Sequence, residues 1–411
     1  MYNASTAFLP SSFSMHFVTL GWSFALEPVN ASPDRTFRAT LCFAIAAVIG
    51  WPFSILIALP FIFEEILLIG HAPGWQFQWR FGRILKSAPA CALILAVVVG
   101  IDSFFYGRFV LAPLNIINYN IFSSAGPDLF GSEPWYFYIL NGALNFNLLL
   151  PLALLSLPLV LVTNFVNPKK LAIAKPGQTR TSVLLLVRLS PFYLWFVVLT
   201  LQAHKEERFL FPANALLCFQ AALSLGLIRG WLEEVYVKIT KAPFNAARTR
   251  IISPITGIVL VLTSFLSVAR ILAISIFFRA PMPLLFHLQY HELPMVAIQS
   301  YPSHYPKLNL TNYSQAEERM DISILNQKNL TLCYGKEWYR FPSSFLVPEV
   351  VRTEYINSRF NGILPKHFTE RRDRVQESKS SYRGRLQIAS DSPAGFNDRN
   401  IKELDRYASP L

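Results

Sequence analysis

Five long stretches of this chain contain no Asp, Glu, Lys or Arg. They lie at residues 1–26, 39–63, 134–168, 209–228 and 251–269. About 20 consecutive apolar residues are enough to cross the hydrocarbon core of a bilayer. A backbone that crosses it must be helical here, because lipid offers its polar groups no hydrogen-bond partners. The sequence therefore predicts an all-α membrane protein.

Composition agrees with this prediction. Charged residues make up 15% of the chain and hydrophobic residues 53%, whereas charged residues are about 25% of a soluble domain. We predict a polytopic helical bundle of about six or seven transmembrane helices, followed by a C-terminal mixed tail domain. The predicted spans are 5–25, 39–63, 84–106, 136–163, 183–203, 209–229 and 251–278.

Three regions follow from this pattern. Residues 1–280 are predicted to form the transmembrane core, and residues 281–371 a polar C-terminal region. Residues 372–411 are polar and are predicted to be disordered, because they offer too little apolar surface to bury.

The loops between the predicted spans alternate in charge. Twelve Lys and Arg residues fall in three loops on one side, and three fall in loops 107–135 and 204–208 on the other. The positive-inside rule places the richer side in the cytosol and the other side, with the C-terminal region, in a lumen. Arg35 and Arg38, in the predicted first loop, are exceptions. The three basic loops are 64–86, 164–182 and 229–250.

The net charge of +12 is thus explained by topology, and we predict no nucleic-acid partner. Three Asn-X-Ser/Thr sequons lie in the predicted lumenal region, at Asn309, Asn312 and Asn329. They are glycosylation candidates if that region is lumenal. Chance occurrence is the alternative.

Other polar groups indicate little chemistry. The four cysteines show no metal-ligand spacing, so we predict no metal site, no cofactor and no disulfide framework. The pairs Glu64-Glu65 and Glu233-Glu234 fall on the predicted cytosolic side and are interpreted as solvated helix ends.

The segment His204-Lys205-Glu206-Glu207-Arg208 interrupts two apolar stretches at the predicted lumenal boundary. On a helical turn Lys205 and Arg208 would share a face, and the N-terminus of the following helix would add partial positive charge. Such a group suits a phosphate, with Glu206 and Glu207 orienting the cations or capping the helix. The alternative is a solvated interfacial loop whose long side chains reach water.

Two further polar groups share the lumenal side. Trp135 and Tyr136 fit an aromatic belt at the membrane interface, or a platform on which a sugar could stack, with Glu133 accepting from its hydroxyls. Asp102, at the end of a predicted span, is either structural or functional.

Several of these segments together resemble a known family. HKEERFLFP at 204–212 is similar to the hallmark of mannosyltransferases that use dolichyl phosphate mannose, which are multi-span, C-type glycosyltransferases. The further segments resemble the alpha-1,2-mannosyltransferases of lipid-linked oligosaccharide assembly, in glycosyltransferase family 22, and the resemblance covers most of residues 4 to 365. These segments are STAFLPSSF at 5–13, GWPFS at 50–54, DSFFYGRFVLAPLNIINYNIF at 102–122, GPDLFGSEPWYFYILNGALNFN at 126–147 and GKEWYRFPSSFLVP at 335–348.

The resemblance implies an inverting transfer of mannose from dolichyl phosphate mannose to a dolichyl-diphosphate-linked oligosaccharide, at the lumenal face of the endoplasmic reticulum, for protein N-glycosylation. The partners would be these donor and acceptor lipids. Lys205 and Arg208 would stabilise the departing phosphate, and His204 could hydrogen-bond to it.

The resemblance also places the catalytic carboxylate in an acidic lumenal loop upstream of anything that resembles this sequence. We therefore expect an N-terminally truncated chain that lacks this carboxylate, with Asp102 and Glu133 as weak candidates for the catalytic base. An inactive form, or a non-catalytic membrane partner, is the alternative function. A transporter is a further one, disfavoured because the sequence shows no inverted repeat.

Overall fold

The computed structural model describes residues 2–27, 32, 34–68, 81–122, 132–171, 179–241, 252–305, 320–335 and 344–356. The chain divides into two compact units, with the described residues up to Ser267 in unit 1 and the described residues from Val268 in unit 2. The division falls inside helix α14 (Ile252–Phe277). The boundaries predicted at 280 and 371 stay predictions.

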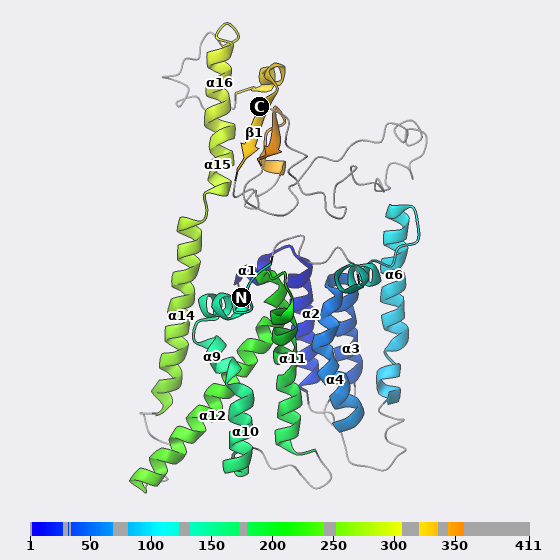
Figure 1. Ribbon diagram of the computed structural model, residues 1–411, viewed down its shortest axis with the longest axis vertical. Helices are drawn as coiled ribbons and strands as arrows, with labels where there is room; N and C mark the ends of the chain where they lie inside the picture. The colour runs from blue at the N-terminus through cyan, green and yellow to red at the C-terminus, as the bar shows by residue number, and fades with distance from the viewer. Residues whose placement is uncertain are drawn as a thin grey trace. The chain divides into compact units, whose positions relative to one another are not determined.

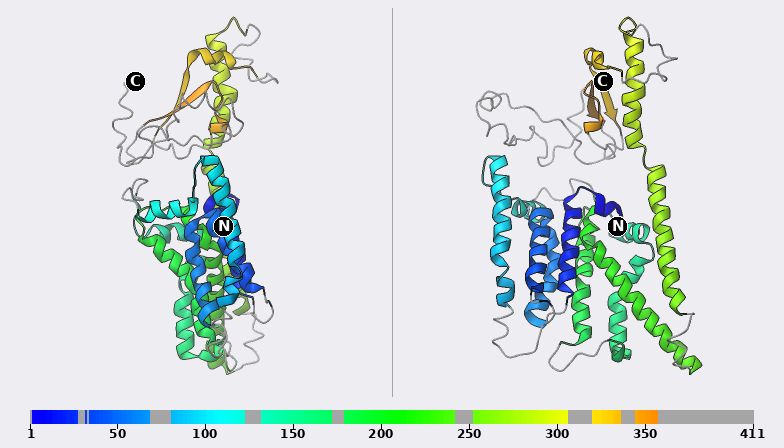
Figure 2. Two further views of the ribbon diagram at one scale, coloured as in Figure 1. Left: turned by 90° about the vertical axis from the view of Figure 1, so that its right-hand side faces the viewer. Right: turned by 180° about the vertical axis from the view of Figure 1, so that it is seen from behind.

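Unit 1 is built from helices, several of which lie side by side (Figures 1 and 2). Its first part contains α1 (Tyr2–Thr6), α2 (Pro10–Ala25), α3 (Arg35–Ile45), η1 (Ala46–Gly50), η2 (Pro52–Ser54), α4 (Ile55–Phe63), η3 (Glu64–Leu68), α6 (Ala88–Tyr106), α7 (Ala112–Ile117) and η4 (Asn118–Phe122). Its second part contains α8 (Phe137–Phe146), α9 (Leu149–Leu154), α10 (Ser156–Val166), η6 (Pro168–Lys170), α11 (Thr181–Leu201), η7 (Glu207–Ala213), α12 (Asn214–Thr240) and the start of α14.

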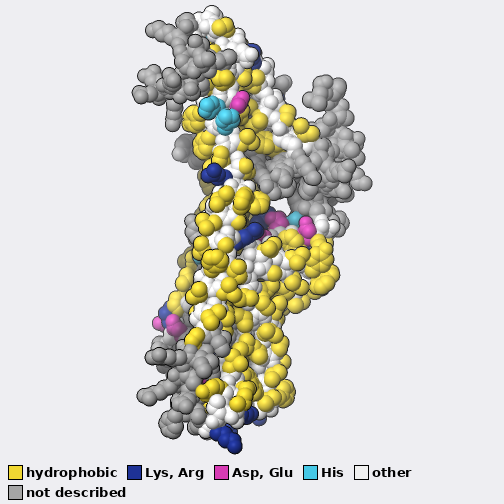
Figure 3. Space-filling model, turned by 90° about the vertical axis from the view of Figure 1, so that its left-hand side faces the viewer, with side chains coloured by type: hydrophobic (Ala, Val, Ile, Leu, Met, Phe, Trp, Pro, Cys, Tyr) yellow, Lys and Arg dark blue, Asp and Glu magenta, His cyan; other side chains and the backbone are white. Residues whose placement is uncertain are grey.

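Four helical segments of the described chain are long and apolar enough to cross a membrane. Many of their large apolar side chains face outward, including Leu93 on α6 and Val261 on α14, 65% and 70% exposed. Figure 3 shows one face on which hydrophobic side chains cover most of the described surface. Such a surface is stable against lipid rather than water, so the predicted all-α, multi-pass membrane fold is confirmed. The four segments are Phe81–Tyr106, Thr181–Leu201, Glu207–Thr240 and Thr256–Ser300.

The prediction of one span at 39–63 was wrong. The chain turns back at Trp51, whose extended backbone separates η1 from η2, and Pro52 starts the next helix. The Ser14 hydroxyl of α2 fixes this turn, donating to the Ala46 carbonyl at 2.9 Å and accepting from the Trp51 N–H at 2.8 Å. Residues 35–68 are therefore a helical hairpin.

A glycine in this turn is required by close packing. A Cβ atom added at Gly50 would fall on the Ser14 hydroxyl oxygen and would lie 3.2 Å from the Ser14 backbone nitrogen. Gly50→Ala is therefore expected to destabilise the protein by about 1–3 kcal/mol, the usual effect of overpacking. Thermal unfolding of the purified protein in detergent measures it.

Gly100→Ala is the matched control. Gly100 lies inside α6, and a Cβ atom there would meet nothing within 4 Å. Because alanine is favoured over glycine in a helix interior by about 0.5–1 kcal/mol, this variant should melt at or above the wild-type temperature. Equal losses in both variants would contradict the role given to the Gly50 turn.

The prediction of one span at 136–163 was also wrong in detail. This stretch forms α8, α9 and α10, with breaks at Asn147 and Leu155. Asn147 has φ 50° and ψ −121°, a conformation with positive φ that residues other than glycine adopt rarely, and α8 ends there. The break sets α8 at a different angle from α10 (Figure 1), and this angle brings α8 to the site described below.

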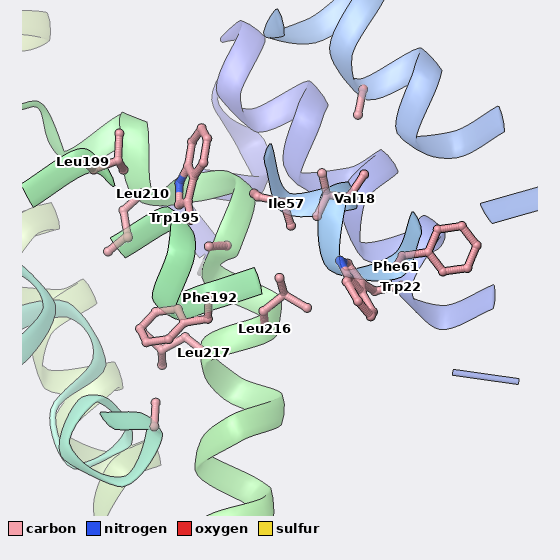
Figure 4. Close-up of a cluster of buried hydrophobic side chains, with 14 of the residues drawn as sticks. Val18, Trp22, Ile57, Phe61, Phe192, Trp195, Leu199, Leu210, Leu216 and Leu217 are labelled. Carbon is pink, nitrogen blue, oxygen red and sulfur yellow. The ribbon is translucent and has the colours of Figure 1, made fainter. Parts of the chain in front are cut away.

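The apolar core of unit 1 lies where α2, α4, α11, η7 and α12 meet (Figure 4). Trp22 contacts Phe61 edge-on at 6.5 Å between ring centroids, and Trp195, which is 1% exposed, belongs to the same cluster as Leu210 and Leu217. In a bilayer, close packing of this kind holds helices together, because lipid is as apolar as the side chains.

A buried charge cluster joins the helices at the other end of α4, and it corrects the interpretation of Glu64 and Glu65 as solvated. Both side chains are 0% exposed. Glu64 accepts from Arg35 at 2.8 Å and from Arg188 at 2.9 and 2.8 Å. Glu65 pairs with Arg35, and with Arg83 at 3.2 Å. Helix α3, η3, the segment before α6, and α11 are thereby tied together.

The hairpin also removes the exceptions to the charge pattern. Because α3 and α4 run in opposite directions, Arg35 lies beside Glu64 and Glu65, on the side of the basic loop 64–86. Arg38, one turn along α3, pairs with Glu27 at 2.7 Å. Both arginines therefore belong to the basic side of the bundle.

Unit 2 combines helices with a small sheet. Strands β1 and β2 pair in parallel with Leu330 opposite Val351, and the side chains of Leu293, Ala297 and Leu325 form a small apolar cluster. The predicted mixed character of the C-terminal region is confirmed for its described part. Its elements are the end of α14, α15 (Pro281–His287), η8 (Leu288–Glu292), α16 (Leu293–Ser300), η10 (Ser323–Lys328), β1 (Leu330–Tyr334), η12 (Ser344–Leu346) and β2 (Val351–Tyr355).

Candidate functional site

The charged segment 204–208 follows α11 and includes the first two residues of η7; it is called the charged box here. It lies beyond Leu201, the C-terminal end of α11, whereas Arg188 of the buried charge cluster lies nearer the N-terminal end. At 1.5 Å per residue, these two positions on α11 are about 20 Å apart along the helix axis. The charged box therefore lies at the end of unit 1 opposite the buried charge cluster.

The expectation that Lys205 and Arg208 share a helical face was wrong. Residues 204–206 are not helical, Glu206 has an extended backbone (φ −132°, ψ 150°), and η7 begins only at Glu207. The two cations therefore occupy different environments.

Lys205 is buried, with 5% of its surface exposed. Its ammonium group donates to the Glu133 carbonyl at 2.8 Å and to the Gln202 carbonyl at 2.5 Å. The Glu133 N–H also donates to the Ala203 carbonyl at 3.0 Å. Lys205 thus joins residues 132–136, which precede α8, to the charged box, and two of its three donors are used in doing so.

Arg208 is 45% exposed and is braced by Glu206. Its Nε lies 2.5 Å from one Glu206 oxygen, and its Nη2 donates to the other at 2.7 Å. The His204 ring also contacts Glu206, at 3.0 Å. Burial alone would raise the pKa of Glu206, but hydrogen bonds from His204 and Arg208 outweigh it and hold the pKa below its usual value. Glu206 is therefore anionic at neutral pH.

An aromatic group supports the backbone of the charged box. Trp195 donates its ring N–H to the Phe209 carbonyl at 2.9 Å, and Trp51 contacts both rings at centroid distances of 5.4 and 5.1 Å. The Tyr138 hydroxyl donates to the Glu206 carbonyl at 3.2 Å. Trp51 belongs to the hairpin turn, so the turn and the charged box form one packed group.

The remaining predicted residues are placed as follows. Trp135 and Tyr136 are 67% and 45% exposed and touch edge-on at 5.7 Å, on the segment that Lys205 holds. Glu133 lies on the same segment with its side chain exposed. Asp102 is half-buried near the end of α6, a different helix. The contacts of Lys205 with Glu133 and of Tyr138 with Glu206 hold this segment at the charged box. The segment carries Glu133, Trp135 and Tyr136, whereas Asp102 is not part of it.

Two residues that sequence reasoning missed complete this arrangement. Asn141 and Asn145 of α8 donate to the Glu207 carboxylate at 3.2 and 3.1 Å. Their spacing of four residues on an apolar helix is a signal that could have found them, because polar side chains in such a helix need partners.

The candidate modification and metal sites divide between described and undescribed parts of the chain. Asn329 is exposed, with φ 47°, immediately before β1; Asn309 and Asn312 lie outside the described residues. Among the described residues, no group of three His, Cys, Asp or Glu side chains could hold a metal ion. The absence of a metal and of a cofactor stays a prediction.

The fold and this site define a multi-pass helical membrane protein with a polar box where the helices end. A sequence model of the Alg9-like mannosyltransferase family matches residues 1–348. The chain belongs to this family.

The most similar curated relatives carry related names. The mouse protein named alpha-1,2-mannosyltransferase ALG9 is 34% identical over 410 residues, which are 99% of this chain and 56% of the relative. The Schizosaccharomyces pombe protein of the same name is 33% identical, over 100% of this chain and 61% of the relative. The zebrafish GPI alpha-1,2-mannosyltransferase 3 is 27% identical over half of this chain.

The chain thus spans somewhat more than half the length of the curated relatives that it matches best. No solved structure matches it.

Proposed function

We propose that this protein transfers mannose from dolichyl phosphate mannose to a dolichyl-diphosphate-linked oligosaccharide, forming an alpha-1,2 linkage for protein N-glycosylation. Family membership supports the proposal, as do relatives named alpha-1,2-mannosyltransferases over nearly the whole of this chain. The charged box, at the end of an apolar bundle where lipid headgroups lie, supports it independently.

The reaction is an in-line displacement. The acceptor hydroxyl oxygen attacks C1 of the mannose, the bond from C1 to the phosphate oxygen breaks, and dolichyl phosphate leaves. A carboxylate must take the proton of the hydroxyl, and Asp102 and Glu133 are the weak candidates for this role among the described residues. Negative charge grows on the phosphate as the bond breaks, so a fixed cation beside it lowers the barrier.

The observation that carries this proposal is the state of Arg208. Among the described residues, Glu206 takes the Nε and Nη2 donors of the guanidinium, which leaves the Nη1 edge for a ligand. A phosphate could bind this edge without releasing Glu206. Lys205, buried against two carbonyls, is instead a positioning residue.

We propose further that the protein lies in the membrane of the endoplasmic reticulum with the charged box facing the lumen. The charge pattern supports this orientation more strongly once Arg35 and Arg38 join the basic side. The donor and acceptor lipids would then reach the charged box from the surrounding bilayer.

Arg208→Ala is expected to lower mannose transfer by about 10²–10³-fold, the usual loss when one group that stabilises developing negative charge is removed. The assay follows radiolabelled mannose from dolichyl phosphate mannose into lipid-linked oligosaccharide, in membranes that contain the full chain. Arg208→Lys should recover only part of the rate, because an ammonium group cannot be braced by two oxygens in the same plane.

Arg229→Ala is the control. Arg229 is 46% exposed and pairs with Glu233 at 2.9 Å on α12, so this variant loses a similar exposed ion pair away from the charged box. It should transfer mannose at the wild-type rate. Wild-type transfer by Arg208→Ala would refute the proposed role of the charged box.

A further inference from the structure

Asn141, Asn145 and Glu207 form a polar cluster beside the charged box. Each Glu207 oxygen accepts from one amide, Oε2 from Asn141 at 3.2 Å and Oε1 from Asn145 at 3.1 Å. The Asn145 amide also donates to the Asn141 oxygen at 3.2 Å. The cluster therefore has a defined geometry that links α8 to the first residue of η7.

The surroundings on α8 make these asparagines conspicuous. Tyr138, Gly142 and Phe146 form the buried stripe of the helix, whereas Leu140 and Leu144 are 57% and 58% exposed. The asparagines lie between these two faces and are half-buried. Polar side chains in an apolar helix at a membrane are costly, and their presence indicates a role.

The cluster has hydrogen-bond acceptors to spare. A carboxylate can accept about four hydrogen bonds, and Glu207, which is exposed, receives two from the described residues. The Asn145 side-chain oxygen receives none from the described residues. A surface rich in acceptors, one of them anionic, favours a ligand with several hydroxyl donors and disfavours a phosphate.

Glu207 and Arg208 are neighbours in the chain. In a glycosyl phosphate, the sugar and the phosphate are neighbours too. Its phosphate is bonded directly to C1 of the sugar, so a phosphate held by Arg208 places the sugar ring within a few ångströms. We propose that Asn141, Asn145 and Glu207 form a subsite that binds the hydroxyls of the sugar carried by the lipid phosphate. This inference rests on the proposed function and assigns its sugar-binding residues.

The competing interpretation is that the cluster only fastens η7 to α8. The two interpretations differ in what they predict for lipids with and without a sugar. A subsite for hydroxyls acts only on the sugar-bearing lipid, whereas a purely structural cluster affects both lipids equally.

The experiment measures the affinity of the full chain, in lipid nanodiscs, for polyprenyl phosphate and for mannosyl phosphoryl polyprenol. Wild type should bind the mannosylated lipid about tenfold more tightly, as expected when one or two hydrogen bonds, one of them charge-assisted, are gained. In Asn141→Ala/Asn145→Ala this ratio should fall toward one. Glu207→Gln, which keeps the shape of the side chain, should lower it as well.

Asn167→Ala is the matched control. Asn167 donates to the Glu234 carboxylate at 3.2 Å, the same type of bond at the C-terminal end of α10. The ratio of the two lipid affinities in this variant should equal the wild-type ratio. Because each ratio compares two ligands on one protein, partial loss of folded protein cancels.

The outcomes separate the subsite from the proposed function. If wild type binds both lipids equally, or if the ratio survives in both cluster variants, the subsite is refuted while phosphate binding stands. If wild type binds neither lipid, the proposed function fails, and the subsite fails with it.

Discussion

Lys205→Met is expected to lower mannose transfer by about a hundredfold, the scale of loss when reacting groups are displaced by about 1 Å. The physical reason is indirect. Methionine fills a similar volume but leaves the Glu133 and Gln202 carbonyls without their buried donor, at a cost of about 1–3 kcal/mol for each. Residues 132–136, which carry Trp135 and Tyr136, would then separate from the charged box.

Two measurements identify this effect as positioning. Lys205→Met should still bind polyprenyl phosphate, whereas Arg208→Ala should not, because only Arg208 is proposed to touch the phosphate. Lys238→Met is the control, since Lys238 is 72% exposed and pairs with Glu234 on the same helix. Loss of phosphate binding in Lys205→Met equal to that in Arg208→Ala would show that Lys205 contacts the ligand.

Glu64→Gln is expected to have the largest effect on stability, about 3–5 kcal/mol, which is the usual result of breaking a buried ion pair from one side. Glutamine keeps the shape of the side chain but leaves Arg35, which is 1% exposed, with Glu65 as its remaining charged partner, and Arg188 without the Glu64 charge. Unfolding of the purified protein in detergent, by heat or by denaturant titration, measures the difference.

Glu233→Gln is the matched control. Glu233 pairs with Arg229 four residues away. Both side chains are more than a third exposed, Glu233 at 35% and Arg229 at 46%. Exposed pairs on one helix contribute about 0.3–0.5 kcal/mol, so this variant should unfold like wild type. An unchanged transition in Glu64→Gln would mean that water reaches the cluster and screens it.

The sequence predicted features that depend on local composition. Long apolar runs indicated helices in a membrane, and the charged box was placed correctly at a helix end. The direction of the helices that the loop charges indicated stays a prediction. The turn at Trp51 was missed although Gly50 and Pro52 are ordinary turn signals. The pattern nevertheless favoured one span, because the stretch 39–63 is long enough and apolar enough to cross a bilayer.

Features that depend on distant partners could not be predicted. Glu64 looks like a solvated helix end because its partners Arg35 and Arg188 are 29 and 124 residues away. Lys205 looks like a phosphate ligand because the carbonyl that it binds belongs to Glu133, 72 residues earlier. The spacing of three residues between Lys205 and Arg208 did not reveal either environment, since residues 204–206 of the charged box are not helical.

The buried charge cluster also has a consequence for biogenesis. Arg188 is translated 124 residues after Glu64, so a ribosome adding about 5–20 residues per second needs roughly 6–25 s to deliver it. During that interval Glu64 and Glu65 have Arg35 and Arg83 as partners, and only the emergence of α11 brings a third arginine. The cluster is therefore assembled in two stages, first among Arg35, Glu64, Glu65 and Arg83, and then by the arrival of Arg188 on α11.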